Sequence, residues 1–228
     1  GSINQFNHAF KSFGWQVVWA DPDDISTFER AISPKTKAVF IESIANPGGT
    51  ITDIEAIAAV AHKAGVPLIV DNTLASPYLI KPIDHGADIV VHSLTKFLGG
   101  HGNSIGGMIV DAGTFDWSKG NKYPMLSEPR PEYHGIKIHE TFGNFAFAIA
   151  CRVLGDPRAS FAAVPPPVNA KLSAEKPPPH SSFFTRLHLD GMWSTTSTNG
   201  RLYGIVGTHM SLVDIARIVE KPAPEAAP

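Results

Sequence analysis

Between residues 1 and 155, short apolar runs of strand length alternate with segments whose apolar positions recur with a helical period. The expected strands are 16–20, 38–41, 66–70, 89–91 and 106–110. The expected helices are 4–12, one that follows the polar segment 21–24 and runs to about residue 31, and one that begins after residue 52. Strands that are apolar at consecutive positions are typical of parallel sheets buried on both faces. The pattern therefore predicts an α/β fold in which a parallel-rich sheet carries helices on both faces.

The helix expected after Thr52 is the best-defined element in the sequence. Thr52 and Glu55 have the spacing of a capping box, in which each side chain bonds a backbone N–H group of the first turn. The apolar positions of one face are Ile54, Ile57, Ala58 and Ala61. Gly65 and Pro67 then predict the end of this helix.

The character of the sequence changes at residue 156. Ten of the 19 prolines lie in the last 73 residues, and helical periodicity is lost until about residue 211. Proline-rich sequence favours extended or disordered backbone. We therefore expect a boundary near Gly155, with a large domain over 1–155 and a largely irregular tail over 156–228 that carries one short helix at 211–220.

Composition narrows the class of ligand and partner. A chain of 228 residues with 43% hydrophobic and 18% charged side chains can bury a sizeable core. The net charge of -2 comes without any block of like charges, so we expect a small-molecule ligand and neither a nucleic-acid nor a membrane partner. No apolar run reaches the ~18 residues of a membrane-spanning helix.

Cysteine and histidine usage bears on redox and metal chemistry. Cys151 is the only cysteine, which excludes an internal disulfide and a thiolate metal cluster and favours a reducing, cytoplasmic setting. The histidines that could suggest a metal site are His92, His101, His134 and His139. Their spacing matches no zinc motif, so we expect no metal site.

The stretch 92–101 contains the most informative chemistry. It follows the apolar run 89–91 and presents Ser93, Thr95 and Lys96 where that strand ends. The carboxyl ends of parallel strands form the usual ligand crevice of α/β proteins. A lysine there can join a carbonyl compound if burial or a neighbouring cation frees its amine, and hydroxyl groups can hold a phosphate.

Asp71 ends the preceding strand, so we expect it at the same edge of the sheet. An aspartate set against a pyridine nitrogen keeps that nitrogen protonated, which is the arrangement used with pyridoxal phosphate (PLP). From the residues alone, plainer interpretations stay open. Lys96 could be a solvated loop residue, Asp71 the cap of a turn, and 46–49 an ordinary turn.

Three ordered segments resemble one family of enzymes. They are Glu42-Ser43-Ile44-Ala45-Asn46-Pro47, Val70-Asp71-Asn72-Thr73, and 92–102 with Ser93-Leu94-Thr95-Lys96 at its centre. In this order they resemble the PLP enzymes of cysteine and methionine metabolism. The segments that make the O-acetylhomoserine sulfhydrylases the most similar group within that family are Phe115-Asp116-Trp117, Lys122-Tyr123-Pro124, Glu128-Pro129 and Tyr133-His134-Gly135. The resemblance covers residues 1–155.

The resemblance implies a fold and a set of site residues. The fold is the large domain of an aspartate-aminotransferase-like PLP transferase, incomplete at both ends. Lys96 would be a buried amine joined covalently to the cofactor, and Asp71 would pair with the ring nitrogen. Ser93 and Thr95 would contact the cofactor phosphate, and Asn46 would bond the ring hydroxyl.

The resemblance also implies an activity, which is γ-replacement. O-acetylhomoserine and sulfide, or a thiol, would give acetate and homocysteine, or a thioether amino acid. Cystathionine γ-synthase chemistry, methionine or cystathionine γ-lyase chemistry and a catalytically inactive fragment stay open as alternatives. The complete enzyme would be a cytoplasmic homotetramer.

The family's C-terminal domain is not recognisable in 156–228. Arg186 and Arg201 lie in no matching motif, so neither receives a substrate-binding role. The abrupt change of composition favours a reading-frame slip, a wrongly assigned junction or an unrelated splice as the origin of the tail.

Overall fold

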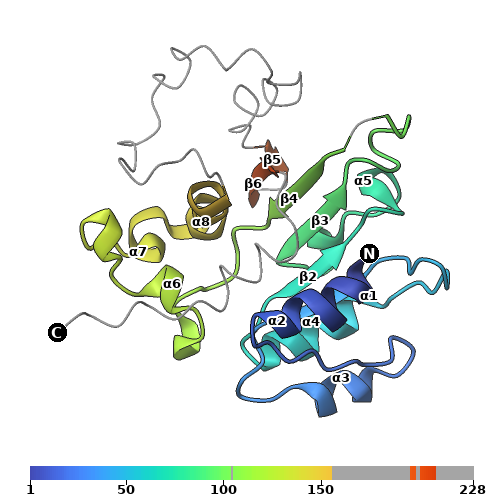
Figure 1. Ribbon diagram of the computed structural model, residues 1–228, viewed down its shortest axis with the longest axis horizontal. Helices are drawn as coiled ribbons and strands as arrows, with labels where there is room; N and C mark the ends of the chain where they lie inside the picture. Colours follow the sequence, from blue (N-terminus) through green and yellow to red (C-terminus); the bar gives the residue numbers. More distant parts are fainter. Residues whose placement is uncertain (104, 156–195, 199–200, 209–228) are drawn as a thin grey trace.

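A six-stranded sheet with the order β1-β2-β3-β4-β6-β5 runs through the part of the chain that the computed structural model describes, residues 1–103, 105–155, 196–198 and 201–208 (Figure 1). The strands are β1 Val39–Glu42, β2 Leu68–Asp71, β3 Ile89–Ser93, β4 Gly107–Asp111, β5 Thr196–Thr198 and β6 Arg201–Thr208. β1, β2 and β3 are parallel, β4 is antiparallel to β3, and β6 is antiparallel to β4. The sheet is thus mixed, with parallel strands β1, β2 and β3 beside antiparallel pairs at β4, β6 and β5, and the α/β fold class is confirmed.

The reversal at β4 follows from the connection that precedes it. Parallel neighbours need a crossover connection, which is usually a helix. In its described residues the segment 94–106 forms turns and no helix, so the chain returns beside β3 in the opposite direction.

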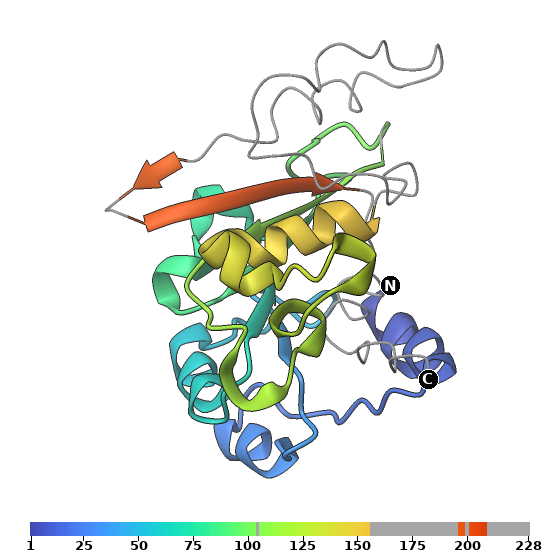
Figure 2. The same ribbon diagram turned by 90° about the vertical axis from the view of Figure 1, so that its left-hand side faces the viewer.

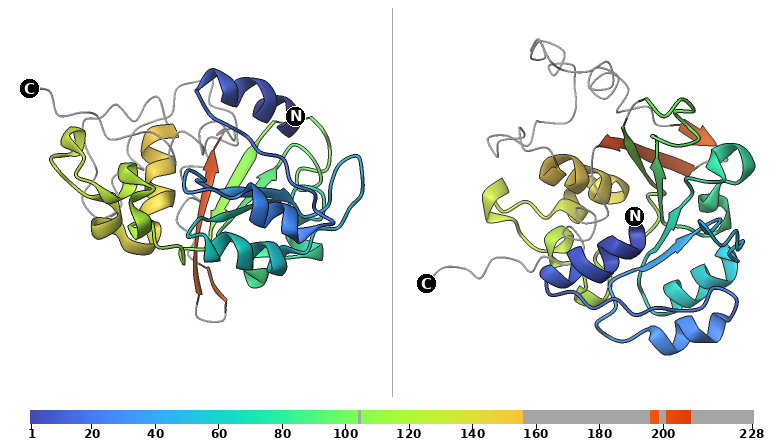
Figure 3. Two further views of the ribbon diagram at one scale, coloured as in Figure 1. Left: turned by 90° about the horizontal axis from the view of Figure 1, so that it is seen from below. Right: turned by 45° about the vertical axis from the view of Figure 1, so that its right-hand side comes forward.

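Helices cover both faces of the sheet, as predicted (Figure 3). One face carries α3 Ile25–Ala31 and α4 Ile54–Lys63, and the other carries α6 Pro124–Ser127, α7 Ile138–Phe142 and α8 Ala146–Gly155. Successive strand residues point to opposite faces. Val70 and Val90 therefore belong to the core on the α4 side, whereas Ile69 and Ile89 belong to the core on the α8 side.

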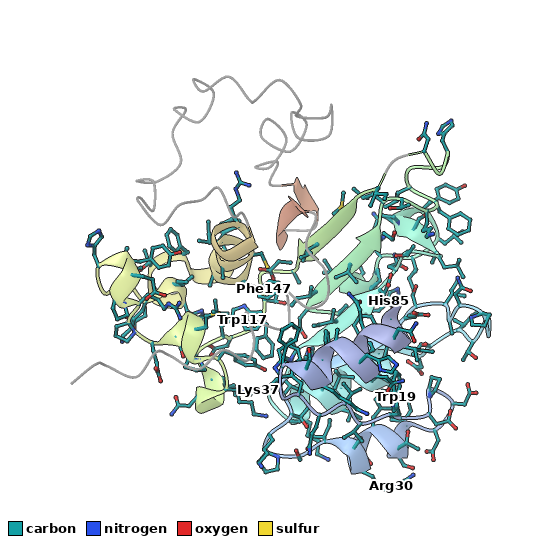
Figure 4. All side chains as sticks on the ribbon, viewed as in Figure 1. Trp19, Arg30, Lys37, His85, Trp117 and Phe147 are labelled. Atoms are coloured by element: carbon teal, nitrogen blue, oxygen red, sulfur yellow. The ribbon has the colours of Figure 1, made fainter. Side chains whose placement is uncertain are left out.

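The core on the α8 side is built around aromatic rings. Trp117 stacks on Phe147 of α8 with ring centroids 4.9 Å apart, and both side chains are fully buried (Figure 4). Tyr123 packs edge-to-face on Trp117 and donates its hydroxyl hydrogen to the Lys37 carbonyl oxygen at 2.9 Å. These aromatic residues stabilise the fold and lie in the core.

The chain begins with one helical segment, which confirms the helix predicted over 4–12. It consists of α1 Ser2–Asn4, a π-helical turn Gln5–Ala9 and α2 Phe10–Ser12, and it ends at Gly14, where φ is +81°. Phe6 of this segment packs edge-to-face on Phe40 of β1. The segment therefore lies on the face opposite α4 (Figure 3).

The predicted strand 16–20 is wrong. This segment has no partner strand among the described residues, and Val18 and Trp19 are 64% and 55% exposed. Its contacts are made by side chains, since the Trp19 ring packs on Phe6 and its indole N–H donates to the Asn7 side-chain oxygen at 3.3 Å. The other predicted strands are confirmed to within a few residues.

The predicted capping box of α4 is also wrong. Asp53, not Thr52, caps the helix, because its carboxylate accepts the Ala56 N–H at 3.0 Å. The Thr52 hydroxyl instead donates to the Glu42 carbonyl oxygen at 2.7 Å, and Glu55 bonds the His85 ring at 2.8 Å.

The remaining helical pieces are short. They are α5 Ser76–Leu79 and the 3₁₀ turns Pro82–His85, Lys119–Asn121, Pro131–Tyr133 and Gly143–Phe145. None of the helices in the described ranges is long and apolar enough to cross a membrane.

The described part of the tail consists of strands. β5 and β6 pair antiparallel, and β6 forms a strand of 8 residues beside β4 where largely irregular backbone was expected (Figure 2). The open edge of β4 offers unpaired backbone groups, which favours strand formation by a segment that reaches it. The predicted helix at 211–220 lies outside the described residues.

Candidate active site

The carboxyl edge of the parallel strands brings the predicted site residues to one part of the molecule. β1, β2 and β3 run in the same direction and end at Glu42, Asp71 and Ser93. Lys96 lies in the turn that follows β3, and Asn46 lies in the loop that follows β1. By strand alternation, Asp71 and Ser93 share the face that carries Ile69 and α8.

A short hydrogen-bonded turn holds Asp71. Its Oδ1 accepts hydrogen bonds from the Thr73 backbone N–H at 3.0 Å and from the Thr73 hydroxyl at 2.5 Å. Thr73 Oγ1 in turn accepts the Ser93 backbone N–H at 2.8 Å, so this hydroxyl joins the ends of β2 and β3. Asp71 therefore caps a turn through Oδ1, as one interpretation of the sequence predicts. No hydrogen bond from the described residues reaches Oδ2.

A buried network of hydrogen bonds centred on Asn72 stabilises this edge of the sheet. Asn72 is fully buried, and its side-chain oxygen accepts the Ser43 hydroxyl at 2.7 Å while its amide donates to the Ile80 carbonyl oxygen at 3.0 Å. Its backbone N–H donates to the Val91 carbonyl oxygen at 2.9 Å. One side chain thus links the ends of β1 and β2 to the exit of α5, and its backbone reaches β3.

His92 lies beneath the predicted site, on the other face of β3 from Ser93. The ring is buried, and Nδ1 has no hydrogen-bond partner among the described residues. Burial lowers the pKa of the His92 imidazole, and the nearby Asp71 carboxylate opposes this with a smaller effect. The ring is therefore neutral at pH 7.

The turn that carries Lys96 is closely folded. Gly99 N–H donates to the Leu94 carbonyl oxygen at 2.8 Å, and Gly100 N–H donates to the Lys96 carbonyl oxygen at 2.8 Å. A Cβ atom at Gly99 would lie 2.4 Å from the Leu94 oxygen, so this position requires glycine. Lys96 itself is exposed, which contradicts the expectation of a buried amine, because the turn extends past the end of β3 and no described segment covers it.

Thr95 closes the base of the loop 94–106. Its hydroxyl oxygen accepts the Gly106 N–H at 3.1 Å and donates to the Gly106 carbonyl oxygen at 3.3 Å. The hydroxyl hydrogen is therefore directed at the protein, and the predicted phosphate contact requires it to turn. Asn46 donates its backbone N–H to the Glu42 carboxylate at 3.1 Å, which fixes the loop after β1.

The groups at this edge fit a phosphorylated pyridine aldehyde. An amine for the aldehyde, a carboxylate with an available oxygen for the ring nitrogen and hydroxyl groups for the phosphate are the types of group that PLP requires. The described residues contain no group of three or more His, Cys, Asp and Glu side chains that could hold a metal ion.

Comparison with known proteins identifies the family. The sequence profile described as "Cys/Met metabolism PLP-dependent enzyme" matches residues 1–156. The chain belongs to this family. Within the Cys/Met metabolism family it is 52% identical over 154 residues to the homocysteine synthase of Schizosaccharomyces pombe, covering 67% of this chain and 36% of the relative. It is 47% identical over 163 residues to the O-acetyl-L-homoserine sulfhydrylase of Leptospira meyeri, covering 68% and 37%.

Solved members of the Cys/Met metabolism family have the same fold. A putative O-acetylhomoserine (thiol)-lyase from Campylobacter jejuni, with N'-pyridoxyl-lysine-5'-monophosphate in its structure, has a TM-score of 0.61 at 36% identity and covers 65% of this chain and 37% of its own. An O-acetylhomoserine sulfhydrylase from Wolinella succinogenes has a TM-score of 0.56 at 36% identity, covering 66% and 39%. The chain thus spans little more than a third of the length of the curated relatives named above.

The sequence pointed to Lys96, Asp71, Ser93, Thr95 and Asn46 but missed the groups that hold them. The missed residues are Ser43, Asn72, Thr73 and Gly106. One signal was available, because Asn72 and Thr73 are polar residues directly after a strand that is otherwise apolar.

Proposed function

We propose that this chain carries the PLP-binding core of a γ-replacement enzyme. Lys96 would form the covalent link to the cofactor, and Asp71 Oδ2 would face the ring nitrogen. Ser93 and Thr95 would contact the phosphate, and Asn46 would bond the ring hydroxyl. The observation that carries the proposal is the meeting of Asp71, Ser93 and the Lys96 turn at one edge of the sheet.

Asp71 and Lys96 would have different roles in the reaction. When bound, PLP supplies a carbonyl carbon for an amine and a ring that can accept electrons. The Asp71 carboxylate would keep the ring nitrogen protonated, which a group fixed by two Thr73 donors is well placed to do. The Lys96 amine would move a proton at the substrate α-carbon once released from the cofactor, since general bases in enzymes act at such short range.

The proposed reaction converts O-acetylhomoserine and sulfide to homocysteine and acetate, or uses a thiol to give a thioether amino acid. The support is the naming of the relatives as homocysteine synthase and O-acetyl-L-homoserine sulfhydrylase. A second candidate is a fragment that captures PLP without turnover. It is favoured by the exposure of Lys96, whose turn no described segment covers.

Cofactor capture tests the proposal directly. We expect the full chain mixed with PLP to show the absorption of covalently bound cofactor, and borohydride reduction followed by peptide mass analysis to locate the label on Lys96. Lys96→Ala should lower the labelling to the background of the other lysines, while Lys63→Ala, an exposed lysine of α4, should not change it. Equal labelling of the two variants would refute the role of Lys96.

Product analysis then separates the reactions. Homocysteine formed from O-acetylhomoserine and sulfide supports the γ-replacement activity. Cystathionine formed from cysteine, or a keto acid released from methionine or cystathionine, supports the synthase or lyase chemistry. Labelling of Lys96 without any product supports the inactive fragment.

We further propose that the complete enzyme is a cytoplasmic homotetramer without nucleic-acid or membrane partners. Large apolar side chains of the segments that follow β2 and β3 are exposed, among them Tyr78 of α5 at 92%, Ile105 at 80% and Phe97 at 63%. Exposed apolar surface of this kind is typical of contacts with further protein.

A further inference from the structure

Two carboxylates are neighbours where the candidate site is placed. Glu42 ends β1 and Asp71 ends β2, and the register of these two parallel strands pairs the two residues directly. Neighbouring strands lie about 4.8 Å apart, and residues paired in this way point to the same face of the sheet. That face carries α8, because Phe40 and Ile69, two positions earlier in each strand, pack in the core on that side. Glu42 therefore shares both the edge and the face of Asp71.

The charges of this pair are not balanced within the described residues. Neither Glu42 nor Asp71 forms an ion pair there, and both side chains are partly exposed. Like charges on adjacent strands repel each other, and the repulsion grows where burial reduces screening by water. The pair therefore favours a ligand that brings a positive charge to this edge of the sheet.

Glu42 also fixes the loop that follows β1. Its Oε2 accepts the Asn46 backbone N–H at 3.1 Å, and its backbone oxygen accepts the Thr52 hydroxyl at 2.7 Å. No hydrogen bond from the described residues reaches Oε1. The side chain thus holds Asn46, the residue that would bond the ring hydroxyl of the cofactor, and keeps one carboxylate oxygen available.

We propose that Glu42 is a second carboxylate of the cofactor site, which positions Asn46 through a hydrogen bond and favours a protonated pyridine ring through its charge. The inference rests on the proposed function, in which Asp71 faces the ring nitrogen. In the sheet order, β1 lies one strand further than β2 from the turn of Lys96. Asp71 would therefore meet the ring nitrogen directly, while Glu42 acts from behind it as a positioning residue.

Two substitutions separate the hydrogen bond of Glu42 from its charge. Glu42→Gln keeps an oxygen that can accept the Asn46 N–H and removes the charge, whereas Glu42→Ala removes both. Glu29→Gln removes a negative charge from an exposed position of α3 and is the control for net charge. Two probes are compared. One is PLP, and the other is a phosphorylated hydroxybenzaldehyde with carbon in place of the ring nitrogen, which cannot carry the positive charge.

Spectroscopic titration of the full chain at pH 7 measures the affinity for each probe. We expect Glu42→Gln to weaken PLP binding about tenfold without weakening binding of the carbon-ring analogue, because only PLP loses an attractive charge pair. Glu42→Ala should weaken the binding of both probes, and Glu29→Gln should weaken neither. Equal PLP affinity in Glu42→Gln and the parent chain, or an equal loss for both probes, would overturn the role of the charge. A parent chain that binds no PLP would refute the proposed function and this inference with it.

Hydrogen exchange in the cofactor-free chain tests the hydrogen bond separately. We expect the Asn46 amide to exchange about tenfold faster in Glu42→Ala than in the parent chain, and at nearly the parent rate in Glu42→Gln. Unchanged exchange of the β3 amides in both variants would show that the sheet is intact. An Asn46 amide that exchanges equally fast in Glu42→Ala and in the parent chain would overturn the proposed positioning of the loop.

Discussion

At the scale of single residues, Asp111 is an unusual group because its carboxyl is buried in the core at the end of β4. Gly113 N–H donates to its Oδ1 at 2.9 Å, whereas Oδ2 has no hydrogen-bond partner among the described residues. Burial raises the pKa of Asp111 to about 7, the backbone amides of Gly113 and, more weakly, Ala148 oppose this, and the nearby Asp88 carboxylate adds to it. At neutral pH the protonated and ionised forms of this carboxyl are therefore both populated.

This burial predicts a pH-dependent stability. The folded-state pKa lies above the unfolded value of about 4, so the stability that protonated Asp111 contributes is complete below about pH 4 and is lost as the pH rises to about 7. The Asp111→Asn side chain stays neutral at every pH. We therefore expect the free energy of unfolding of this variant, taken relative to the parent chain, to be about 1–3 kcal/mol higher at pH 8 than at pH 5. Urea unfolding at both values measures this.

The comparison between variants is needed because His92 acts in the opposite direction. Its pKa is lowered by burial, so it reduces stability as the pH falls through the range in which histidine titrates. The difference between Asp111→Asn and the parent removes this contribution, and Asp23→Asn, an exposed carboxyl, provides the control. A difference that is the same at both pH values would contradict the prediction.

The residues that carry chemistry were easier to predict than those that hold them. Asp71 and Lys96 follow apolar strands, and that position alone places them at a carboxyl edge. The hydrogen bond from Ser93 N–H to Thr73 Oγ1 depends on the register of β2 against β3, and this register cannot be predicted from the sequence. The exposure of Lys96 likewise depends on which segments cover the turn.

At the scale of elements, helix periodicity and apolar runs were sufficient for most of the fold. The segment 16–20 has the composition of a strand but finds no partner among the described residues, because pairing is a property of two segments and not of one. The cap of α4 differs from the prediction for a similar reason. The Thr52 hydroxyl donates to the Glu42 carbonyl oxygen, so the side chain of the neighbouring Asp53 caps the helix instead.

The turn after β3 is the element on which cofactor capture depends. Gly99→Ala would place a Cβ atom 2.4 Å from the Leu94 oxygen, so the turn must open and Lys96 must shift. We expect PLP labelling of Lys96 to fall at least tenfold, with a change of about 1–3 kcal/mol in the free energy of unfolding. Spectroscopic titration with PLP and urea unfolding measure the two effects.

Gly48→Ala is the matched control for this turn. Gly48 lies in the loop after β1, and a Cβ atom there would be 3.8 Å from its nearest neighbour, the Thr50 hydroxyl oxygen. Labelling of Lys96 should stay within about twofold of the parent chain, because no contact is strained. An equal loss of Lys96 labelling in both variants would show that cofactor capture does not depend on the turn at Gly99.

At the scale of the whole molecule, the exposed apolar side chains of the carboxyl edge predict self-association and poor solubility of this chain. Phe97→Ser combined with Tyr78→Ser should lower the associated fraction severalfold in analytical ultracentrifugation, because these two rings are 63% and 92% exposed. Val18→Ser, which removes a 64% exposed side chain from another part of the surface, should leave association unchanged. A monodisperse parent chain with full activity would contradict this prediction.

The order of the first three strands has a consequence for biosynthesis. β1, β2 and β3 are neighbours in the sheet in the same order in which they follow one another in the chain, so pairing them requires no residue beyond Ser93. Folding during synthesis begins with the segments that leave the ribosome first. The edge that gathers Asp71 and Lys96 can therefore assemble during translation, before β4 and everything after it has been synthesised.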